Sequence, residues 1–244
     1  MSSRAAAGVA GSIGAAMPRR LLPALLVAVL ALAGCASRHA TRAAAPATSA
    51  APPPATTAAS TTGTTVPPRP RYRFPVAGCR VTYAHVHHDY PATDILAPRG
   101  CRVVSPVDGR VDEVSRVDRW SASTNRGADR GGRSVSVVGV DGVRYYGSHL
   151  DWVAPGVVPG APVRAGQLLG RVGDSGDARG GPTHLHFGLS WPTRPGAWWV
   201  RRGVLYPWLY LDAWRAGRDA SPAAAVRAAR AAAGRAVPPC RVDC

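Results

Sequence analysis

The residues best suited to chemistry in this sequence are histidines, and most of them are grouped. Seven histidines are present, and His39 stands apart from the rest. The others lie in three places along the chain: His85, His87 and His88; His149; and His184 with His186. His184 and His186 are two residues apart, so a β-strand would project both side chains from one face of a sheet.

These histidines could build a metal site for hydrolysis. Hydrolytic Zn²⁺ takes three His, Asp or Glu ligands and keeps a fourth position for water. An aspartate that opens a strand, a histidine on the loop before it and a histidine on a neighbouring strand would supply the three ligands. Two histidines would remain for acid–base work. The spacing alone also allows hydrogen-bonded structural histidines or ligands of a structural metal.

Short β-branched runs broken by glycine and proline must position these side chains. We predict strands over 101–105, 109–115, 134–140, 143–148, 167–172 and 184–190. Asp141-Gly142 separates two of these runs, which is a strong hairpin signal. The pattern predicts an all-β domain over residues 72–212, built as an antiparallel sheet or sandwich. Residues 115–133 would form a long exposed loop that lines a functional groove.

The C-terminal part predicts short helices instead of strands. A helix over 206–214 would pack Trp208 and Trp214 on the sheet. The serine–proline pair at 221–222 suits an N-cap and first helical position, so we expect an Ala/Arg helix to follow. Because that helix has almost no large apolar residue, we expect residues 213–244 to form a basic, solvated tail, with a helix that binds a partner or the wall as the alternative.

The N-terminal segment is typical of secretion. A pair of arginines precedes an apolar run over residues 21–33, which is too short to span a bilayer, and Leu32-Ala33-Gly34-Cys35 closes the run. We interpret residues 1–34 as a signal peptide. The cysteine at the cleavage point resembles a bacterial lipobox, which implies that Cys35 is lipidated. The alternative is an ordinary signal peptide with an incidental cysteine.

Residues 35–71 would then form a tether. After Cys35 this stretch is mostly Ala, Thr, Pro and Ser, with no acidic and no aromatic residue, so it cannot bury enough apolar surface to order itself. At about 3.1 Å per residue, an extended tether would reach on the order of 100 Å. We therefore expect an exported, cell-surface lipoprotein at the outer face of the cytoplasmic membrane.

The charge indicates an anionic partner. The net charge is +16, and the 30 basic residues are all arginine. Loss of residues 1–34 would remove three arginines and no acid, which leaves +13. Export argues against nucleic acid and leaves anionic lipid or an acidic wall polymer. The 27 glycines and 23 prolines exclude a coiled coil or a helical repeat. We expect a monomer.

Besides the lipidated Cys35, four cysteines would remain after export, where disulfides are permitted. They are Cys79, Cys101, Cys240 and Cys244. Three pairings are possible, and we favour Cys79–Cys101 with Cys240–Cys244.

Four motifs occur in order between residues 72 and 192. They are His88-Asp89-Tyr90-Pro91-Ala92-Thr93-Asp94, Ser148-His149-Leu150, Gly173-x-Ser175-Gly176 and Pro182-Thr183-His184-Leu185-His186-Phe187. Together they resemble the LytM/lysostaphin-type zinc peptidases. The resemblance implies that Zn²⁺ is held by His88, Asp94 and His186. It also implies that His149 and His184 are the catalytic histidines.

The first motif departs from the commonest spacing of this family. That spacing places three residues between the histidine and the aspartate, whereas five separate His88 from Asp94. His87 therefore stays open as the first ligand, and we expect His85 at the surface or behind the ligands. A Cys79–Cys101 disulfide would clamp the loop that carries these histidines.

The resemblance implies a zinc metalloendopeptidase that hydrolyses peptide bonds in the stems or cross-bridges of peptidoglycan during cell-wall remodelling. One catalytic histidine would pass a proton from water to the leaving amine, and the other would stabilise the tetrahedral oxyanion. Tyr83 or Tyr145 is a candidate for a further oxyanion donor, with sheet packing as the alternative. A groove could be walled by Arg119, Trp120, Trp191, Arg194, Trp198, Trp199, Arg201 and Arg202.

Two other functions stay open. Some proteins of this fold lack metal ligands and act as binding modules that activate cell-wall amidases, so a catalytically weak module or wall scaffold is the alternative. The filled ligand and catalytic positions favour an enzyme. A lipoprotein that only binds the wall would keep its wall affinity after metal removal.

Overall fold

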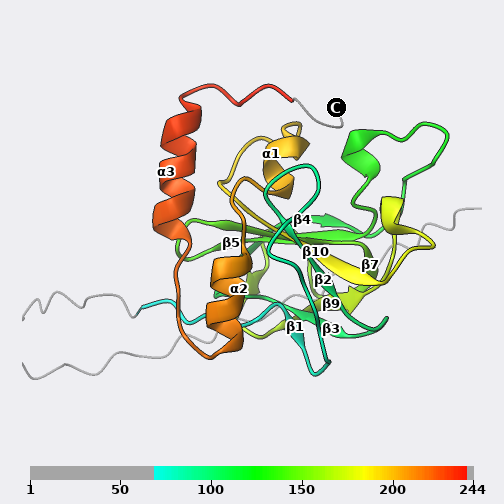
Figure 1. The fold of residues 1–244 in the computed structure, drawn as a ribbon, viewed down its shortest axis with the longest axis horizontal. Helices are drawn as coiled ribbons and strands as arrows, with labels where there is room; N and C mark the ends of the chain where they lie inside the picture. The colour runs from blue at the N-terminus through cyan, green and yellow to red at the C-terminus, as the bar shows by residue number, and fades with distance from the viewer. Residues whose placement is uncertain (1–68, 241–244) are drawn as a thin grey trace, which may run out of the picture. The chain divides into compact units, whose positions relative to one another are not determined.

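The structure is a computed structural model that describes residues 69–240 (Figure 1). The predicted signal peptide at 1–34, the lipidated Cys35, most of the tether and Cys244 lie outside the described residues, so those assignments stay predictions. Among the residues that are described, no helix is both long and apolar enough to cross a membrane.

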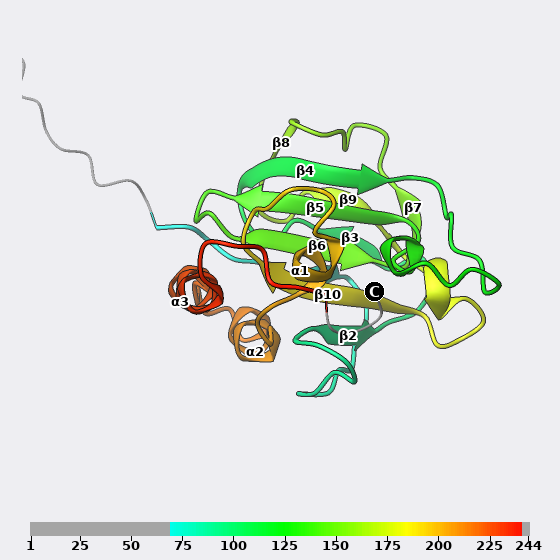
Figure 2. The ribbon, with the colours of Figure 1, turned by 90° about the horizontal axis from the view of Figure 1, so that it is seen from above.

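Two antiparallel sheets make up the domain (Figure 2). The first has four strands, in the order β1 (Val76–Ala77), β3 (Arg102–Val104), β9 (Leu168–Val172) and β7 (Leu150–Val153). The second has six strands, in the order β2 (Thr93–Leu96), β10 (His184–Ser190), β6 (Arg144–Ser148), β5 (Ser134–Gly139), β4 (Gly109–Ser115) and β8 (Pro162–Val163). The predicted antiparallel, mostly β fold is confirmed.

The six predicted strands are all present, with ends within one residue of the prediction. The structure adds β1, β7 and β8, which have two to four residues each. Strands this short show no readable alternation of apolar and polar residues. It also adds β2 where the predicted ligand set requires a strand, and Asp94 is its second residue.

The hairpin of β5 and β6 turns at Asp141-Gly142, as predicted. Gly142 has a φ of +77°, a left-handed backbone conformation that favours glycine. The Gly139 N–H donates to the Val143 carbonyl oxygen at 2.8 Å. Since β6 pairs with β10, the hairpin brings His149, the residue after β6, to the start of the strand that carries His184.

One hydrophobic cluster contains side chains from both sheets. The most deeply buried include Val107, Val137, Leu150, Val172, Leu185, Phe187 and Leu189, each at most 2% exposed. Burying one such side chain contributes roughly 1.5–3 kcal/mol relative to leaving it exposed. The core therefore makes the two sheets a firm support for the loops at their edges.

Three short helices follow the last strand: α1 (Trp198–Arg202), α2 (Trp208–Arg215) and α3 (Ala223–Ala233). Helix α1, which was not predicted, lies against β10 and β6 (Figure 2). Helix α2 confirms the predicted helix and buries Trp214, whose ring stacks on Tyr72 at a centroid distance of 5.4 Å. Two 3₁₀ turns, Gly127–Asp129 and Gly176–Ala178, lie in loops.

Helix α3 corrects the expectation of a solvated tail. The helix forms where it was predicted, but Ala223 and Val226 are buried in the hydrophobic cluster. Alanine permits a close approach between a helix and its support, so a face with few large side chains still packs. The predicted boundary after residue 212 falls inside α2.

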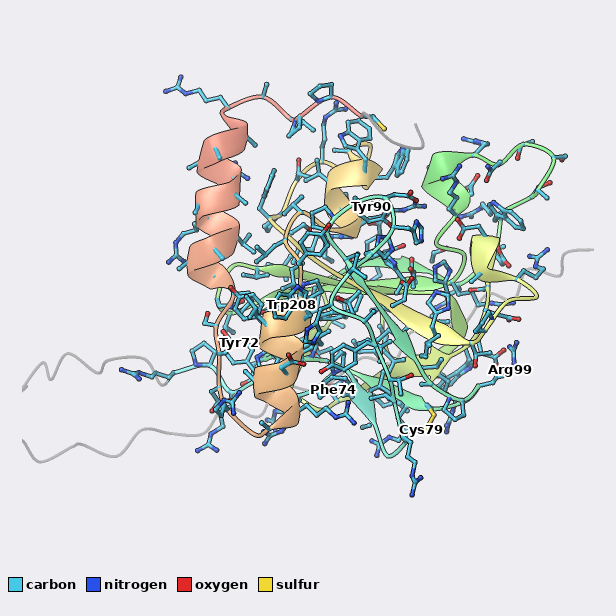
Figure 3. All side chains as sticks on the ribbon, in the orientation of Figure 1. Tyr72, Phe74, Cys79, Tyr90, Arg99 and Trp208 are labelled. Atoms are coloured by element: carbon cyan, nitrogen blue, oxygen red, sulfur yellow. A yellow bond between two sulfur atoms is a disulfide. The ribbon has the colours of Figure 1, made fainter. Side chains whose placement is uncertain are left out.

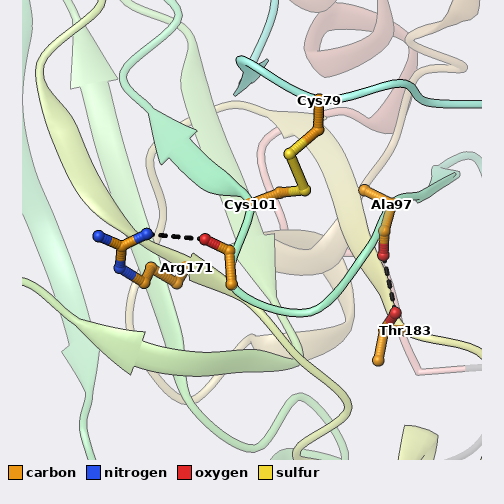
Figure 4. The surroundings of a disulfide bond; sticks show 6 residues. Cys79, Ala97, Cys101, Arg171 and Thr183 are labelled. Carbon is orange, nitrogen blue, oxygen red and sulfur yellow. Dashed lines mark hydrogen bonds between the residues drawn. A yellow bond between two sulfur atoms is a disulfide. The ribbon is translucent and has the colours of Figure 1, made fainter.

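The predicted Cys79–Cys101 disulfide is confirmed (Figure 4). It ties the segment before the first histidines to the turn between β2 and β3. That turn is held further by Arg171, whose side chain donates to the Gly100 carbonyl oxygen at 2.8 Å. The second predicted pair ends at Cys244, outside the described residues.

Candidate metal centre

Strand register places two predicted ligands opposite each other. Strand β2 pairs with β10, and Asp94 is the direct partner of His186. Directly opposed residues have Cβ atoms about 4.5–5.5 Å apart. The flanking Thr93 and Ile95 are buried, so alternation directs Asp94 to the other face of the sheet, where His186 also lies. The structure thus brings together Asp94 and His186 as predicted.

His87 completes the set. One potential ligand atom from each of His87, Asp94 and His186 can be chosen so that all three lie within 4.8 Å of one another. The Nδ1 of His186 is 3.0 Å from Oδ1 of Asp94. The Nε2 of His87 is 3.7 Å from Oδ2 of the same carboxylate. A buried strand pair and a histidine on the loop before it therefore form the site.

This geometry corrects the prediction that His88 is the first ligand. The side chain of His88 is 70% exposed, and its Nδ1 lies 2.6 Å from Oδ2 of Asp89. The ring of His87 is almost fully buried beneath it, at a centroid distance of 4.2 Å. Both histidines lie on an irregular loop before β2, where no strand or helix period fixes which side chain turns inward.

His149 lies where the chain passes from one sheet to the other. It stands between β6 and β7 with a φ of +63°, a left-handed conformation that costs a residue other than glycine roughly 1–2 kcal/mol. Its N–H donates to the Gly131 carbonyl oxygen at 3.0 Å. Its Nδ1 lies 2.8 Å from the Ser175 carbonyl oxygen. Loop contacts from two directions therefore hold the residue in this strained position.

His184 faces His149 across the site. The two rings have a centroid distance of 4.8 Å. The Nδ1 of His184 lies 2.8 Å from the Pro182 carbonyl oxygen. Because a carbonyl oxygen only accepts a hydrogen bond, Nδ1 carries the proton in both histidines. The Nε2 of each neutral ring is then the nitrogen that can accept a proton.

Burial sets the protonation state of the site. Burial, together with the nearby His186, lowers the pKa of His87 to about 4. Burial likewise lowers the pKa of His149 to about 3, with contributions from His186 and His184. Burial opposes ionisation of Asp94, but the hydrogen bond from His186 and the surrounding histidines hold its pKa well below the usual range. Neutral imidazoles and an ionised carboxylate are the forms that bind metals.

The donor set fits zinc. Metal–ligand bonds of about 2.0–2.2 Å in a tetrahedral site place ligand atoms roughly 3.3 Å apart, close to the 3.0 and 3.7 Å separations at Asp94. The Nδ1 of His87 is buried and forms no hydrogen bond within residues 69–240. The described part of the chain thus contains the His–Asp–His site typical of zinc peptidases.

The three ligands line a pocket of about 300 Å³. The pocket is also lined by His149, His184 and residues from several loops. Its other lining residues are His88, Asp89, Tyr90, Arg130, Gly131, Ser148, Asp177, Ala178 and Arg202. Ligands and candidate acid–base groups therefore open onto one space.

Tyr90, Arg130 and Asp177 were not predicted as site residues. The Oη of Tyr90 lies 3.2 Å from Nε2 of His186, and burial raises the pKa of Tyr90, which keeps the phenol protonated. Asp177 approaches Nδ1 of His149 to 3.9 Å, and burial raises its pKa. The sequence does contain a hint that Tyr90 belongs to the site, since Tyr90 lies inside the motif from His88 to Asp94.

Part of the predicted groove wall is at the site. Arg202 lines the metal pocket, and an adjoining pocket of about 180 Å³ shares Gly131 and Arg202 with it. Arg119, Trp198 and Arg201 line that second pocket. The metal centre therefore continues into a longer site with a basic wall.

Other predicted wall residues have structural roles. Trp191 is buried in the core, and Nε1 of Trp199 donates to the Pro238 carbonyl oxygen. Trp120 and Arg194 line neither of these two pockets. Trp120 instead lies beneath the guanidinium of Arg179 at 5.8 Å.

The two tyrosines considered as oxyanion donors lie elsewhere. The Oη of Tyr83 donates to Asp212 at 2.7 Å, and the Oη of Tyr145 donates to Asp141 at 2.6 Å. Neither lines the metal pocket. His85 is at the surface, where its Nε2 pairs with Asp212 at 3.1 Å.

A mostly β domain with a His–Asp–His site and two further imidazoles has the features of the metallopeptidase class. Residues 88–196 match the model of peptidase family M23. This segment is therefore similar to peptidase family M23. His87 lies one residue before the matched segment.

Known proteins show the same likeness. An L-Ala--D-Glu endopeptidase of Bacillus subtilis (strain 168) is 30% identical over 105 residues, which are 41% of this chain and 29% of that protein. The chain thus spans less than a third of its length. The lysostaphin catalytic domain of Staphylococcus simulans is 22% identical, with a TM-score of 0.41 over 54% of this chain and 92% of that chain. A zinc-containing peptidase of Vibrio cholerae is 22% identical, with a TM-score of 0.36 over 50% of this chain and 36% of that chain.

Proposed function

We propose that this protein is a zinc-dependent endopeptidase that hydrolyses peptide bonds in the stems or cross-bridges of peptidoglycan. The observation that carries the proposal is the convergence of His87, Asp94 and His186 with two carbonyl-anchored histidines in one pocket. A structural metal site would have no use for two such imidazoles beside its ligands. A complete set also argues against a binding module without activity.

The chain's own residues divide the chemistry. Bound zinc would act as a Lewis acid and lower the pKa of water toward about 7. His149 and His184 each turn Nε2 to the pocket because a backbone carbonyl holds Nδ1. One of them accepts the proton of the attacking water and passes it to the leaving amine, and the other donates to the developing oxyanion.

A peptide substrate suits the extent and charge of the site. The metal pocket and its neighbour share Gly131 and Arg202, so a chain several residues long could lie across both. Arg119 and Arg202 supply cations on that path, and peptidoglycan stems carry carboxylates. The relative from Bacillus subtilis, named an L-Ala--D-Glu endopeptidase, supports a stem peptide as the substrate.

We further propose that the protein works outside the cell, anchored by lipid at Cys35. The apolar run that ends in Leu32-Ala33-Gly34-Cys35 supports export and lipidation. The Pro-rich residues up to 71 would give the domain reach into the wall. Its partners would be peptidoglycan and the membrane, with the domain acting as a monomer.

Digestion of purified peptidoglycan by the purified full-length chain tests the proposal. We expect mass spectrometry to find peptides with new amino termini, to lose them after chelation and to regain them when zinc is added back. His184→Ala, with zinc bound, is the matched inactive control. If no new amino termini form, or if they form equally after chelation, the proposal is wrong. Release that requires an added amidase would support the activator alternative instead.

A further inference from the structure

Tyr90 contacts both histidine ligands of the set His87, Asp94 and His186 without being a ligand itself. Figure 3 labels it on the loop that precedes β2. Its Oη lies 3.2 Å from Nε2 of His186. Its ring lies 4.8 Å from the ring of His87 and 5.6 Å from the ring of His186, measured between centroids.

The two nitrogens of His186 have different neighbours. Nδ1 lies 3.0 Å from Asp94, the neighbouring ligand, whereas Nε2 lies at the hydroxyl of Tyr90. A neutral histidine offers one bare nitrogen to a metal and keeps a proton on the other. Without metal, Nδ1 donates to the ionised carboxylate of Asp94. Zinc bound at Nδ1 would require the other tautomer, in which Nε2 carries the proton and donates it to Oη of Tyr90.

We propose that Tyr90 is a positioning residue for the metal centre. When Nδ1 of His186 binds the metal, Tyr90 accepts the hydrogen bond from Nε2, which favours the tautomer that leaves Nδ1 available to zinc, and its ring packs against His87, which holds that ring in place. The inference rests on the zinc site of the proposed function. Partners behind metal-bound histidines act in this way in other metalloproteins, and their loss typically costs 10–100-fold in metal affinity or activity.

The surroundings of His186 offer no substitute for this bond. The rings of Tyr146 and His149 meet it edge-on, at centroid distances of 6.1 and 5.9 Å. Within the described residues, Tyr90 makes the one hydrogen bond recorded at Nε2. Loss of the hydroxyl therefore leaves Nε2 without a hydrogen-bond partner among these residues.

The fold also holds Tyr90 in place from behind. A Cβ added to Gly203 would come within 2.2 Å of the Pro91 carbonyl oxygen. The backbone after α1 thus packs tightly on the residue next to Tyr90. Residues 89–93, which separate the histidines from Asp94, bring Tyr90 back over the ligands.

Zinc affinity of Tyr90→Phe tests the proposal. Phenylalanine keeps the ring that packs on His87 and removes only the acceptor, so we expect a folded protein that binds zinc 10–100-fold more weakly in competition with a chelator. Tyr146→Phe is the matched control, since its ring also meets His186 edge-on, and we expect its zinc affinity to match the wild type. Excess zinc should restore most of the lost hydrolysis in Tyr90→Phe.

A second readout is the tautomer of His186. Imidazole ¹⁵N NMR of the zinc-loaded wild type should show the proton of His186 on Nε2, and in Tyr90→Phe the signal should shift. A proton on Nδ1 in the wild type would overturn the proposal. So would unchanged zinc affinity in Tyr90→Phe, including the case in which only turnover falls and the hydroxyl acts on the substrate. Tight zinc binding without peptidoglycan hydrolysis would refute the proposed function and leave the role of Tyr90 standing.

Discussion

At the scale of single residues, burial decides which of two adjacent histidines can bind a metal. His87 has its ring under the loop and a pKa lowered to about 4 by burial and by His186, so it is neutral at neutral pH. His88 faces solvent and pairs with Asp89. The ring of His87 is buried with Nε2 3.7 Å from the carboxylate of Asp94, where zinc can reach it. The Nδ1 of His88 is already bonded to a surface carboxylate and is turned away from the site.

We predict opposite metal contents for alanine variants of these neighbours. His87→Ala leaves two protein ligands and should lose most of its zinc, whereas His88→Ala should keep about one zinc per chain. Metal analysis of the two purified, folded proteins measures this, and each variant serves as the control for the other. Zinc loss confined to His88→Ala would restore His88 as the ligand and remove His87.

We predict that His149→Ala and His184→Ala retain zinc but lose turnover. Neither residue is needed to complete the ligand set, and general acid–base groups typically contribute about 10²–10⁴-fold. Rates of peptidoglycan hydrolysis, compared at equal zinc content, measure the loss. Near-normal rates in either variant would exclude an acid–base role for that histidine. Loss of zinc would instead make it a ligand.

The sequence could predict Asp94 and His186 but could not choose between His87 and His88. The period of a strand fixes which way His186 points, and the motif context selects the aspartate opposite it. The loop before β2 has no such period. The direction in which the side chain of His87 points therefore depends on contacts such as the one with the ring of Tyr90. The same limit hid Tyr90, whose contacts appear only once the loop folds back.

At the scale of elements, helix α2 supports the loop of the metal site. The ring of His85 stacks on Trp208 of α2 at a centroid distance of 4.4 Å, and its Nε2 pairs with Asp212 at 3.1 Å. Figure 3 labels Trp208 on this helix. Since His85 precedes His87 by two residues, α2 braces the segment that carries this ligand. The helix itself lies outside residues 88–196, which match family M23.

We predict that Trp208→Ala weakens the metal site from a distance. Loss of an aromatic stack costs about 0.5–1.5 kcal/mol, so the free energy of unfolding should fall by that order and zinc affinity should fall severalfold. Denaturant unfolding and chelator competition measure the two effects. Leu209→Ala is the control, because Leu209 is on the same helix and 59% exposed. Equal zinc affinity in Trp208→Ala and the wild type would show that α2 does not brace the loop.

The longer strands could be predicted from their β-branched runs, whereas the shortest strands form because they pair with neighbouring strands. Strand β7 has four residues and gains its place by pairing with β9 after the chain turns at His149. No local pattern marks that turn, because a histidine in a left-handed conformation has no sequence signature. Helix α3 was predicted for its residues but not for its packing, since Ala223 and Val226 give little sign of burial.

At the scale of the whole molecule, charge and tether bear on where the domain acts. The chain carries +16, and +13 would remain after loss of residues 1–34. A basic surface attracts both wall polymers and anionic lipid, with a strength that falls as salt rises. Charge alone therefore does not distinguish a membrane protein from one that binds the wall, and the proposed lipid anchor at Cys35 is the feature that would distinguish them.

We predict that Cys35→Ala detaches the protein from the membrane. One diacylglycerol gives marginal binding and a second acyl chain makes anchoring stable, so without the cysteine the protein should reach the medium or remain as an uncleaved precursor. Fractionation of cells with intact-mass measurement distinguishes these outcomes, and Ser37→Ala, which leaves the cysteine in place, is the control. If Cys35→Ala is cleaved normally and still fractionates with membranes in high salt, the lipid anchor is excluded, and the basic segment that contains α3 becomes the next candidate.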